Sequence, residues 1–177
     1  MTRQRQCKIC KAIYTPIRPL QSVCGVTCAI ALGNQKAVKK ALRTYREDSK
    51  TLTQHKKDTQ VYFNRYINLR DMHKPCISCQ KSPYLGKRNA SHFRPRSTAA
   101  ILSYNFLQVR SSCEPCNSNL SGNLVQYRIA LAKILTPEQL AAIENNNKRA
   151  DFTVEYLKRL QGILKRRVKY YKKLRGV

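Results

Sequence analysis

The chain has 177 residues, with 35 Lys and Arg against 9 Asp and Glu, which gives a formal net charge of +26. This charge argues against a metabolic enzyme, because the repulsion between so many like charges opposes a compact fold, and it favours a polyanionic partner. The sequence contains no long apolar run and no visible N-terminal signal peptide, so that partner is not expected to be a membrane. Nucleic acid is therefore the predicted partner, either of an enzyme or of a ribosome-like RNA-binding protein.

All eight cysteines stand in four close pairs, namely Cys7/Cys10, Cys24/Cys28, Cys76/Cys79 and Cys113/Cys116. Without a secretory signal, a disulfide framework is not expected. A Cys-x-x-Cys turn places two thiolates on one side of the chain, and two such turns complete a tetrahedral zinc shell. The sequence therefore predicts two structural zinc ions, one held by the first two pairs and one by the last two.

The first predicted domain, residues 1–28, is a four-cysteine zinc finger with too little apolar material to fold without metal. Residues 29–73 follow as a basic helical linker. Its first part, to about Asp58, is predicted to be one long solvated helix, and a second helix over about residues 59–72 packs on the next zinc module. The first helix is either a spacer or an arm that tracks phosphates. Its candidate DNA contacts are Lys36, Lys39, Lys40 and Arg43.

The second zinc module is predicted over residues 74–128. Two strand-like segments, residues 90–93 and 106–109, lie between its cysteine pairs, and a helix with an apolar face begins after Gly122. The predicted fold class is therefore mainly α, with a small zinc-bound ββα module. The N-terminal four-cysteine finger is joined to this module by the long basic helix.

The last predicted domain, residues 129–177, consists of basic helices. Thr136-Pro137-Glu138-Gln139 has the pattern of a capping box, and Thr153 is placed to cap the final helix. Apolar residues at near-heptad spacing give that helix a seam, which either packs within the chain or forms a dimer zipper. Its basic residues are candidate DNA contacts, among them Lys165, Arg166 and Arg167.

The second module contains, in order, a His after a short strand (His92), an Asn in a loop (Asn105), and Cys-x-x-Cys-Asn opening a helix (Asn117). This is the order found in HNH nucleases, so the ββα module is predicted to be of the HNH or His-Me finger kind. As general base, His92 would take a proton from water so that hydroxide can attack phosphorus. Asn105 would hold the imidazole or brace its backbone, and Asn117 would offer an oxygen to Mg²⁺ or Mn²⁺. Taken singly, these residues also fit plainer roles as a surface or core histidine, a turn residue and a helix cap.

The chain resembles the NinG/Rap family of lambdoid phage recombination proteins over nearly its whole length. The resemblance is carried by the Cys7-Lys8-Ile9-Cys10 finger, by residues 63–71 before Pro75-Cys76-Ile77-Ser78-Cys79, by Ser91-His92-Phe93, and most distinctively by residues 120–128. The second module also resembles endonuclease VII of tailed phages. These resemblances imply a structure-specific endonuclease in the host cytoplasm that cuts branched recombination intermediates such as D-loops and Holliday junctions. They map the general base to His92 and a metal ligand to Asn117.

The sequence departs from these relatives where a metal-binding carboxylate is expected. Ser91, a poor ligand, stands in place of the Asp before the catalytic His, and it would share the divalent ion with Asn117. Asn89 replaces an acidic residue common in the family, and Gln108 replaces an Asn. Weak metal binding is therefore expected, completed by substrate phosphate. The alternative function is a non-catalytic DNA-binding recombination accessory protein with a degenerate HNH site.

Binding to branched or double-stranded DNA is expected to be salt-sensitive and largely blind to sequence. Arg94 and Arg96 stand close to His92 in the sequence and are predicted phosphate contacts. A homodimer is possible, because symmetric resolution of a junction favours two sites on opposed strands.

Overall fold

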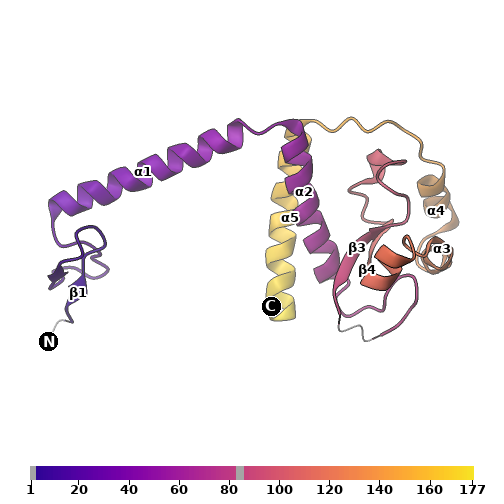
Figure 1. Ribbon diagram of the computed structural model, residues 1–177, viewed down its shortest axis with the longest axis horizontal. Helices are drawn as coiled ribbons and strands as arrows, with labels where there is room; N and C mark the ends of the chain where they lie inside the picture. Colours follow the sequence, from indigo (N-terminus) through magenta and orange to yellow (C-terminus); the bar gives the residue numbers. More distant parts are fainter. Residues whose placement is uncertain (1–2, 83–85) are drawn as a thin grey trace. The chain divides into compact units, whose positions relative to one another are not determined.

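The computed structural model describes residues 3–82 and 86–177 (Figure 1). The chain is mostly helical, as predicted, and its internal contacts divide it into one unit that ends at Lys50 and a second unit, Thr51–Val177. The first unit contains strands β1 (Arg5–Gln6) and β2 (Ile13–Tyr14) and helix α1 (Val26–Asp48). The second contains α2 (Leu52–Arg70), β3 (Arg88–His92), a 3-10 helix (Ala100–Leu102), β4 (Val109–Cys113), a π-helical turn (Pro115–Asn119), α3 (Leu124–Ala132), α4 (Pro137–Glu144) and α5 (Val154–Arg175).

Helix α1 is solvated along its whole length, since none of its residues is buried. The prediction of one continuous helix to about Asp58 is nevertheless wrong, because α1 ends at Asp48 and α2 begins after Thr51. The Thr51 hydroxyl accepts a hydrogen bond from the backbone N–H of Gln54, whose side chain in turn accepts from the backbone N–H of Thr51. This capping box satisfies N–H groups at the start of α2 and so favours a new helix over a continued one.

Helices α2 and α5 lie side by side and form the main core of the second unit (Figure 1). Phe63 and Ile67 of α2 and Leu157 and Leu164 of α5 have no exposed surface. Burial of side chains of this size contributes roughly 2 kcal/mol each. The apolar seam predicted for the last helix therefore packs within the chain, which was one of the two alternatives.

Strands β3 and β4 form an antiparallel hairpin in which Arg88 pairs with Cys113 and His92 pairs with Val109 (Figure 1). The second strand begins at Val109, so its predicted position over residues 106–109 is wrong. The side-chain oxygen of Asn105 accepts hydrogen bonds from the backbone N–H groups of Leu107 and Gln108, at 2.8 and 3.1 Å. This local turn competes with strand formation and delays the start of β4.

The hairpin is fixed to α2 by Arg70 and Asp71, which form a bidentate ion pair at 2.8 and 2.6 Å. Arg70 also donates to the carbonyls of Phe106 and Val109, and the Asp71 carboxylate accepts from the backbone N–H of Ser111. Burial opposes ionisation of Asp71, but the hydrogen bonds and charge of Arg70 outweigh it and hold the pKa of this carboxyl below its usual range. The pair joins the end of α2 to β4 and to the loop before it.

Helix α3 is held against the hairpin by Tyr127, whose side chain is fully buried. The Tyr127 hydroxyl lies between the two strands, where it donates toward the carbonyls of Ser91 and Gln108 and accepts from the backbone N–H of Arg110. The segment before α3 has three successive residues with positive φ, Ser121 to Asn123. The distinctive residues 120–128 therefore contain a left-handed turn, residues 121–123, followed by the start of α3, and this turn directs α3 back onto the sheet.

The C-terminal helices begin as the sequence predicted. Thr136 forms a capping box with Gln139 at the start of α4, and the Thr153 hydroxyl accepts from the backbone N–H of Tyr156 at the start of α5. Leu140 and Ile143 of α4 pack with α3 in a second small core. Among the described helices, none is both long enough and apolar enough to cross a membrane.

Asp71→Asn should destabilise the protein by about 3 kcal/mol, because it leaves the guanidinium of Arg70 buried without its counter-charge. The matched control is Glu144→Gln, which breaks the more exposed Arg128–Glu144 pair and should cost less than about 1 kcal/mol. Urea unfolding of the zinc-loaded chain measures both changes. Equal losses for the two variants would show that the Arg70–Asp71 pair does not anchor the hairpin.

Candidate metal centres and candidate active site

Two clusters bring the eight cysteines together as the sequence predicted. One contains Cys7, Cys10, Cys24 and Cys28, and the other Cys76, Cys79, Cys113 and Cys116, with all sulfur atoms of a cluster within 4.8 Å of one another. Individual Sγ–Sγ distances are 3.5 and 3.7 Å in the first cluster and 3.8 Å in the second. Four sulfurs around a tetrahedral zinc ion, each about 2.3 Å from the metal, stand about 3.8 Å apart. Both donor sets therefore fit Zn²⁺.

The first turn of each cluster has the same backbone geometry. Lys11 and Gln80, which follow the second cysteine of each turn, have φ values of 65° and 56°. Their backbone N–H groups donate to the carbonyls of Cys7 and Cys76, at 3.1 and 2.9 Å. The left-handed residue closes the turn so that both cysteine sulfurs point to one side. Lys and Gln do not favour a positive φ, so the geometry of the metal site accounts for this backbone conformation.

The thiols of each cluster have opposed acidities. Burial opposes ionisation of Cys7 and Cys76, but backbone N–H groups directed at their sulfurs outweigh it and lower the pKa of these thiols to about 6 and about 7. Neighbouring thiols raise the pKa of Cys24 to about 12, and burial together with neighbouring thiols raises that of Cys116 to about 12. A dication at the centre removes this repulsion, so metal binding and thiol ionisation are coupled.

His92 ends β3 with its ring half-buried and held in one orientation. Its Nε2 atom lies 3.0 Å from the carbonyl oxygen of Ser103. Because a carbonyl can only accept a hydrogen bond, Nε2 must carry the proton, which leaves Nδ1 as the basic nitrogen of the neutral ring. Among the described residues, Nδ1 has no hydrogen-bond partner. Burial and then the charge of Arg96 lower the pKa of His92, against the effect of the Ser103 carbonyl.

The loop around His92 is braced by the fully buried side chain of Gln108, whose amide oxygen and amide nitrogen each form a hydrogen bond. Its oxygen accepts from the backbone N–H of Arg94 at 2.8 Å, and its nitrogen donates to the carbonyl of Leu102 at 2.9 Å. Arg94 follows His92 by two residues and Leu102 directly precedes Ser103, so Gln108 joins the two segments whose hydrogen bond orients the imidazole. Sequence reasoning noted Gln108 only as a departure from the family and missed this positioning role, which its polar character in an apolar segment could have suggested.

The other predicted site residues have different surroundings. Asn105 braces its own turn rather than the imidazole, since its side-chain oxygen bonds to Leu107 and Gln108. Ser91 is buried, and because neighbours in a strand face opposite sides, it lies on the other face of the hairpin from His92. Asn117 lies in the π-helical turn, half-buried, and its side chain forms no hydrogen bond with the described residues.

A preformed site for a hard divalent ion is not found in the described part of the chain. The two cysteine clusters are the only groups of three or more His, Cys, Asp or Glu ligands there. Asp71 is occupied by Arg70, Lys74 and Ser111, and Glu114 pairs with Lys87 at 3.0 Å. Without a free carboxylate, these residues do not fit a resident Mg²⁺ or Mn²⁺ ion.

The two arginines predicted beside His92 have different roles. The Arg94 guanidinium donates to the carbonyls of Ile143, Glu144 and Asn146 at the C-terminal end of α4, at distances from 2.8 to 3.3 Å. It therefore caps α4, and its donors are engaged inside the protein. Arg96 is exposed and lines a cavity of about 210 Å³ together with Lys56, Lys57 and Ser103, among other residues. Arg96 thus places one positive charge near His92.

The remaining predicted DNA contacts lie on exposed helix surfaces. Lys36, Lys39, Lys40 and Arg43 are exposed on α1, and Lys165, Arg166 and Arg167 are exposed on α5. Lys165 lies over the ring of Tyr62, and Arg167 over the rings of Tyr66 and Phe106. These stacked cations have restricted positions on the surface of the second unit.

The fold and its clusters define a mostly helical, strongly basic protein with two four-cysteine centres suited to metal. The profile of the family described as "Bacteriophage Lambda NinG protein" matches residues 1–174. The chain belongs to this family, which confirms the resemblance found in the sequence.

Several relatives come from phages of enteric bacteria. "Protein ninG" of Escherichia phage lambda is 33% identical over 64% of this chain and 55% of its own length. The protein of the same name from Salmonella phage P22 is 31% identical over the same shares, and that from Enterobacteria phage H19B is 30% identical over 94% of this chain and 92% of its own length. The match thus spans about half the length of the lambda and P22 relatives. No solved structure matches.

Cys113→Ser and Cys10→Ser should each remove one bound zinc ion, with different consequences. The first should unfold the β3–β4 hairpin, because Cys113 joins β4 to the cluster. The second should leave the Thr51–Val177 unit folded, since its cluster is separate. Elemental analysis counts the zinc, and amide hydrogen exchange reports the hairpin. Unchanged zinc content in both variants would contradict the assignment of the two clusters.

Proposed function

We propose that this protein is an HNH-type DNA endonuclease that cuts branched recombination intermediates, with His92 as general base. The observation that carries the proposal is the hydrogen bond from His92 Nε2 to the carbonyl of Ser103. It orients the ring and leaves Nδ1 as a proton acceptor. Because the ring is half-buried and not enclosed, Nδ1 needs no partner inside the protein and can take a proton from water.

The proposed reaction is hydrolysis of one phosphodiester bond. His92 Nδ1 takes a proton from a water molecule, the resulting hydroxide forms a bond to phosphorus, and the bond from phosphorus to the leaving sugar oxygen breaks. The leaving oxygen takes a proton from solvent. Cations around the site, among them Arg96, stabilise the negative charge that develops on the phosphate oxygens.

A divalent ion is proposed to arrive with the DNA rather than to reside in the free protein. When bound, such an ion supplies charge neutralisation at the scissile phosphate. The substrate phosphate would provide the oxygen ligands that the described residues lack, with the amide oxygen of Asn117 as the candidate ligand from the protein. Ser91 is a weaker candidate, because it is buried and has no carboxylate.

The choice of branched DNA rests on the resemblance to the NinG/Rap family and to endonuclease VII. Net charge and the exposed cations of α1 and α5 support binding to any nucleic acid. A homodimer that places two sites on opposed strands remains part of the proposal. A junction, a duplex of equal length and a structured RNA, compared at one salt concentration, separate these partners.

His92→Ala should reduce nicking of a synthetic junction by about 10²- to 10⁴-fold in the presence of Mg²⁺ or Mn²⁺, because the general base is lost. Junction affinity should change little. The matched control is His73→Ala, which removes an exposed histidine outside the site and should leave nicking unchanged. Single-turnover cleavage and fluorescence anisotropy measure the two properties.

Equal nicking by the wild-type protein and His92→Ala would refute the assignment of the base. A wild-type protein that binds junctions tightly but cuts nothing across a series of divalent ions would instead favour the non-catalytic accessory protein. Zinc content and circular dichroism of each variant show that it is folded.

Arg96→Gln should weaken binding to DNA of any sequence and reduce the slope of log affinity against log salt by about 1, because one phosphate contact is lost. Arg94→Gln should instead lower the melting temperature, since Arg94 caps α4. Anisotropy over a salt series, with thermal unfolding of both variants, distinguishes the roles. A full salt slope for Arg96→Gln would remove this residue from the interface.

A further inference from the structure

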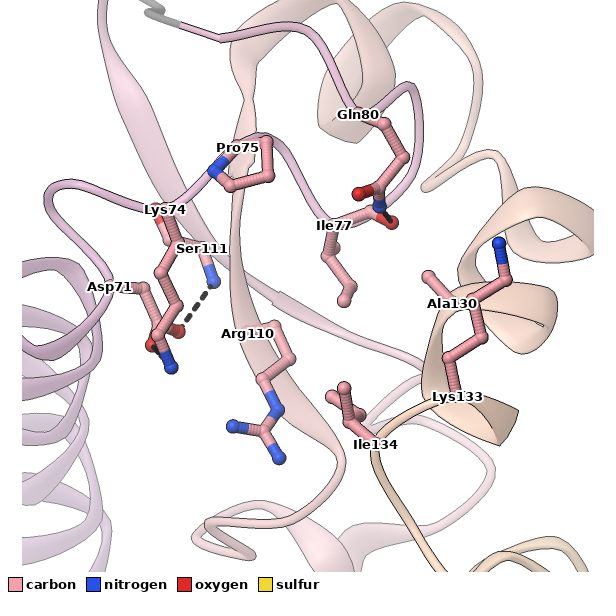
Figure 2. A pocket seen from close by; sticks show the side chains of 10 residues that line it. All are labelled: Asp71, Lys74, Pro75, Ile77, Gln80, Arg110, Ser111, Ala130, Lys133 and Ile134. Atoms are coloured by element: carbon pink, nitrogen blue, oxygen red, sulfur yellow. Dashed lines mark hydrogen bonds and ion pairs between the residues drawn. The ribbon is translucent and has the colours of Figure 1, made fainter.

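A second cavity, of about 310 Å³, lies between the end of α2, the first turn of the second cysteine cluster, β4 and the end of α3 (Figure 2). One wall is apolar and consists of Pro75, Ile77 and Ile134, with Ala130 beside them. Three cations, Lys74, Arg110 and Lys133, also line it. Its size is at the lower end of the range for small-molecule sites, so it has room for a single nucleotide.

Arg110 lines this cavity and has no ion-pair partner among the described residues. Its Nε atom donates to the carbonyl of Leu107 at 3.2 Å, while its two terminal nitrogens have no hydrogen-bond partner among the described residues. Arg70 and Arg128, by contrast, pair with Asp71 and Glu144. A half-buried guanidinium with unused donors is suited to a phosphate, which it can bind through two parallel hydrogen bonds.

The carboxylate of Asp71 does not make this cavity a cation site. Asp71 is occupied by Arg70, by Lys74 and by the backbone N–H of Ser111, the last of these drawn in Figure 2. The cations on the wall therefore exceed the free anions, and the ligand should be an anion with an apolar part. A nucleotide combines a phosphate with a flat base of that kind.

We propose that this cavity binds one unpaired nucleotide of a DNA substrate, with its phosphate at Arg110 and its base against Pro75, Ile77 and Ile134. The choice of DNA rests on the proposed function.

Arg110 pairs with Ser91 in the hairpin, next to the pair formed by His92 and Val109. The cavity therefore stands one residue pair away from the candidate base, on the other face of the same two strands. A displaced strand, such as that of a D-loop, has unpaired nucleotides, so the cavity gives a physical basis for preferring branched DNA of that kind.

The test compares three duplexes of equal length by fluorescence anisotropy with the zinc-loaded full chain. One is fully paired, one carries a single unpaired thymidine, and one carries an abasic residue in the same place. The wild-type protein should bind the thymidine bulge about fivefold more tightly than the abasic bulge, because only the former has a base to bury. The abasic bulge has the same number of phosphates, so its affinity corrects for charge.

Ile134→Asp should abolish this preference, because the base loses part of its apolar wall. Arg110→Met and Lys133→Met should weaken binding to both bulges, because both bulges carry the phosphate. Ile134 and Lys133 are exposed, so their replacement leaves the core intact even if Arg110→Met folds poorly. The matched control is Arg159→Met, which removes an exposed cation of α5 away from the cavity and should lower all three affinities equally.

Equal affinity of the wild-type protein for the two bulges would overturn the proposal. So would a preference that Ile134→Asp retains, or bulge affinities that Arg110→Met lowers no more than Arg159→Met does. Binding of free thymidine monophosphate as tight as that of the bulged duplex would instead make the cavity a free-nucleotide site, which also overturns it. Failure here leaves nicking by His92 untouched, whereas a protein that binds bulged DNA selectively but cuts none would overturn only the nuclease proposal.

Discussion

The ion pair between Arg70 and Asp71 is the interaction on which the second unit depends. It ties the last turn of α2 to β4 through three backbone groups, at Phe106, Val109 and Ser111. The cysteine cluster holds the opposite end of the same hairpin, where Arg88 pairs with Cys113. A strand pair this short is marginal alone, so both attachments are needed to hold His92, which pairs with Val109 at the end that Arg70 fixes.

Local signals predicted much of the helical framework. Cysteine spacing identified both metal clusters, and the capping residues Thr136 and Thr153 located the starts of α4 and α5. The break between α1 and α2 was misplaced to about residue 58, because the Thr51–Gln54 capping box lies in a polar, mostly basic stretch that no Pro or Gly interrupts. The start of β4 was misplaced because a side-chain turn at Asn105 overrides an apolar segment with strand character.

The candidate site could be predicted less completely, because its geometry depends on contacts distant in sequence. His92 was identified from motif order, but its orientation depends on the carbonyl of Ser103, and the loop between them depends on Gln108. Nothing local to Arg94 shows that its guanidinium caps α4, about fifty residues further on. Charge counts alone gave Arg94 and Arg96 the same role, whereas burial and hydrogen bonding separate them.

The tautomer of His92 at neutral pH tests the account most directly. The nitrogen-15 NMR spectrum of the imidazoles in the zinc-loaded protein should show a neutral ring with its proton on Nε2, because that nitrogen donates to the carbonyl of Ser103. Replacement of His92 assigns the signal. A ring protonated on Nδ1, or one that carries both protons at neutral pH, would contradict the claim that His92 is held ready to accept a proton from water.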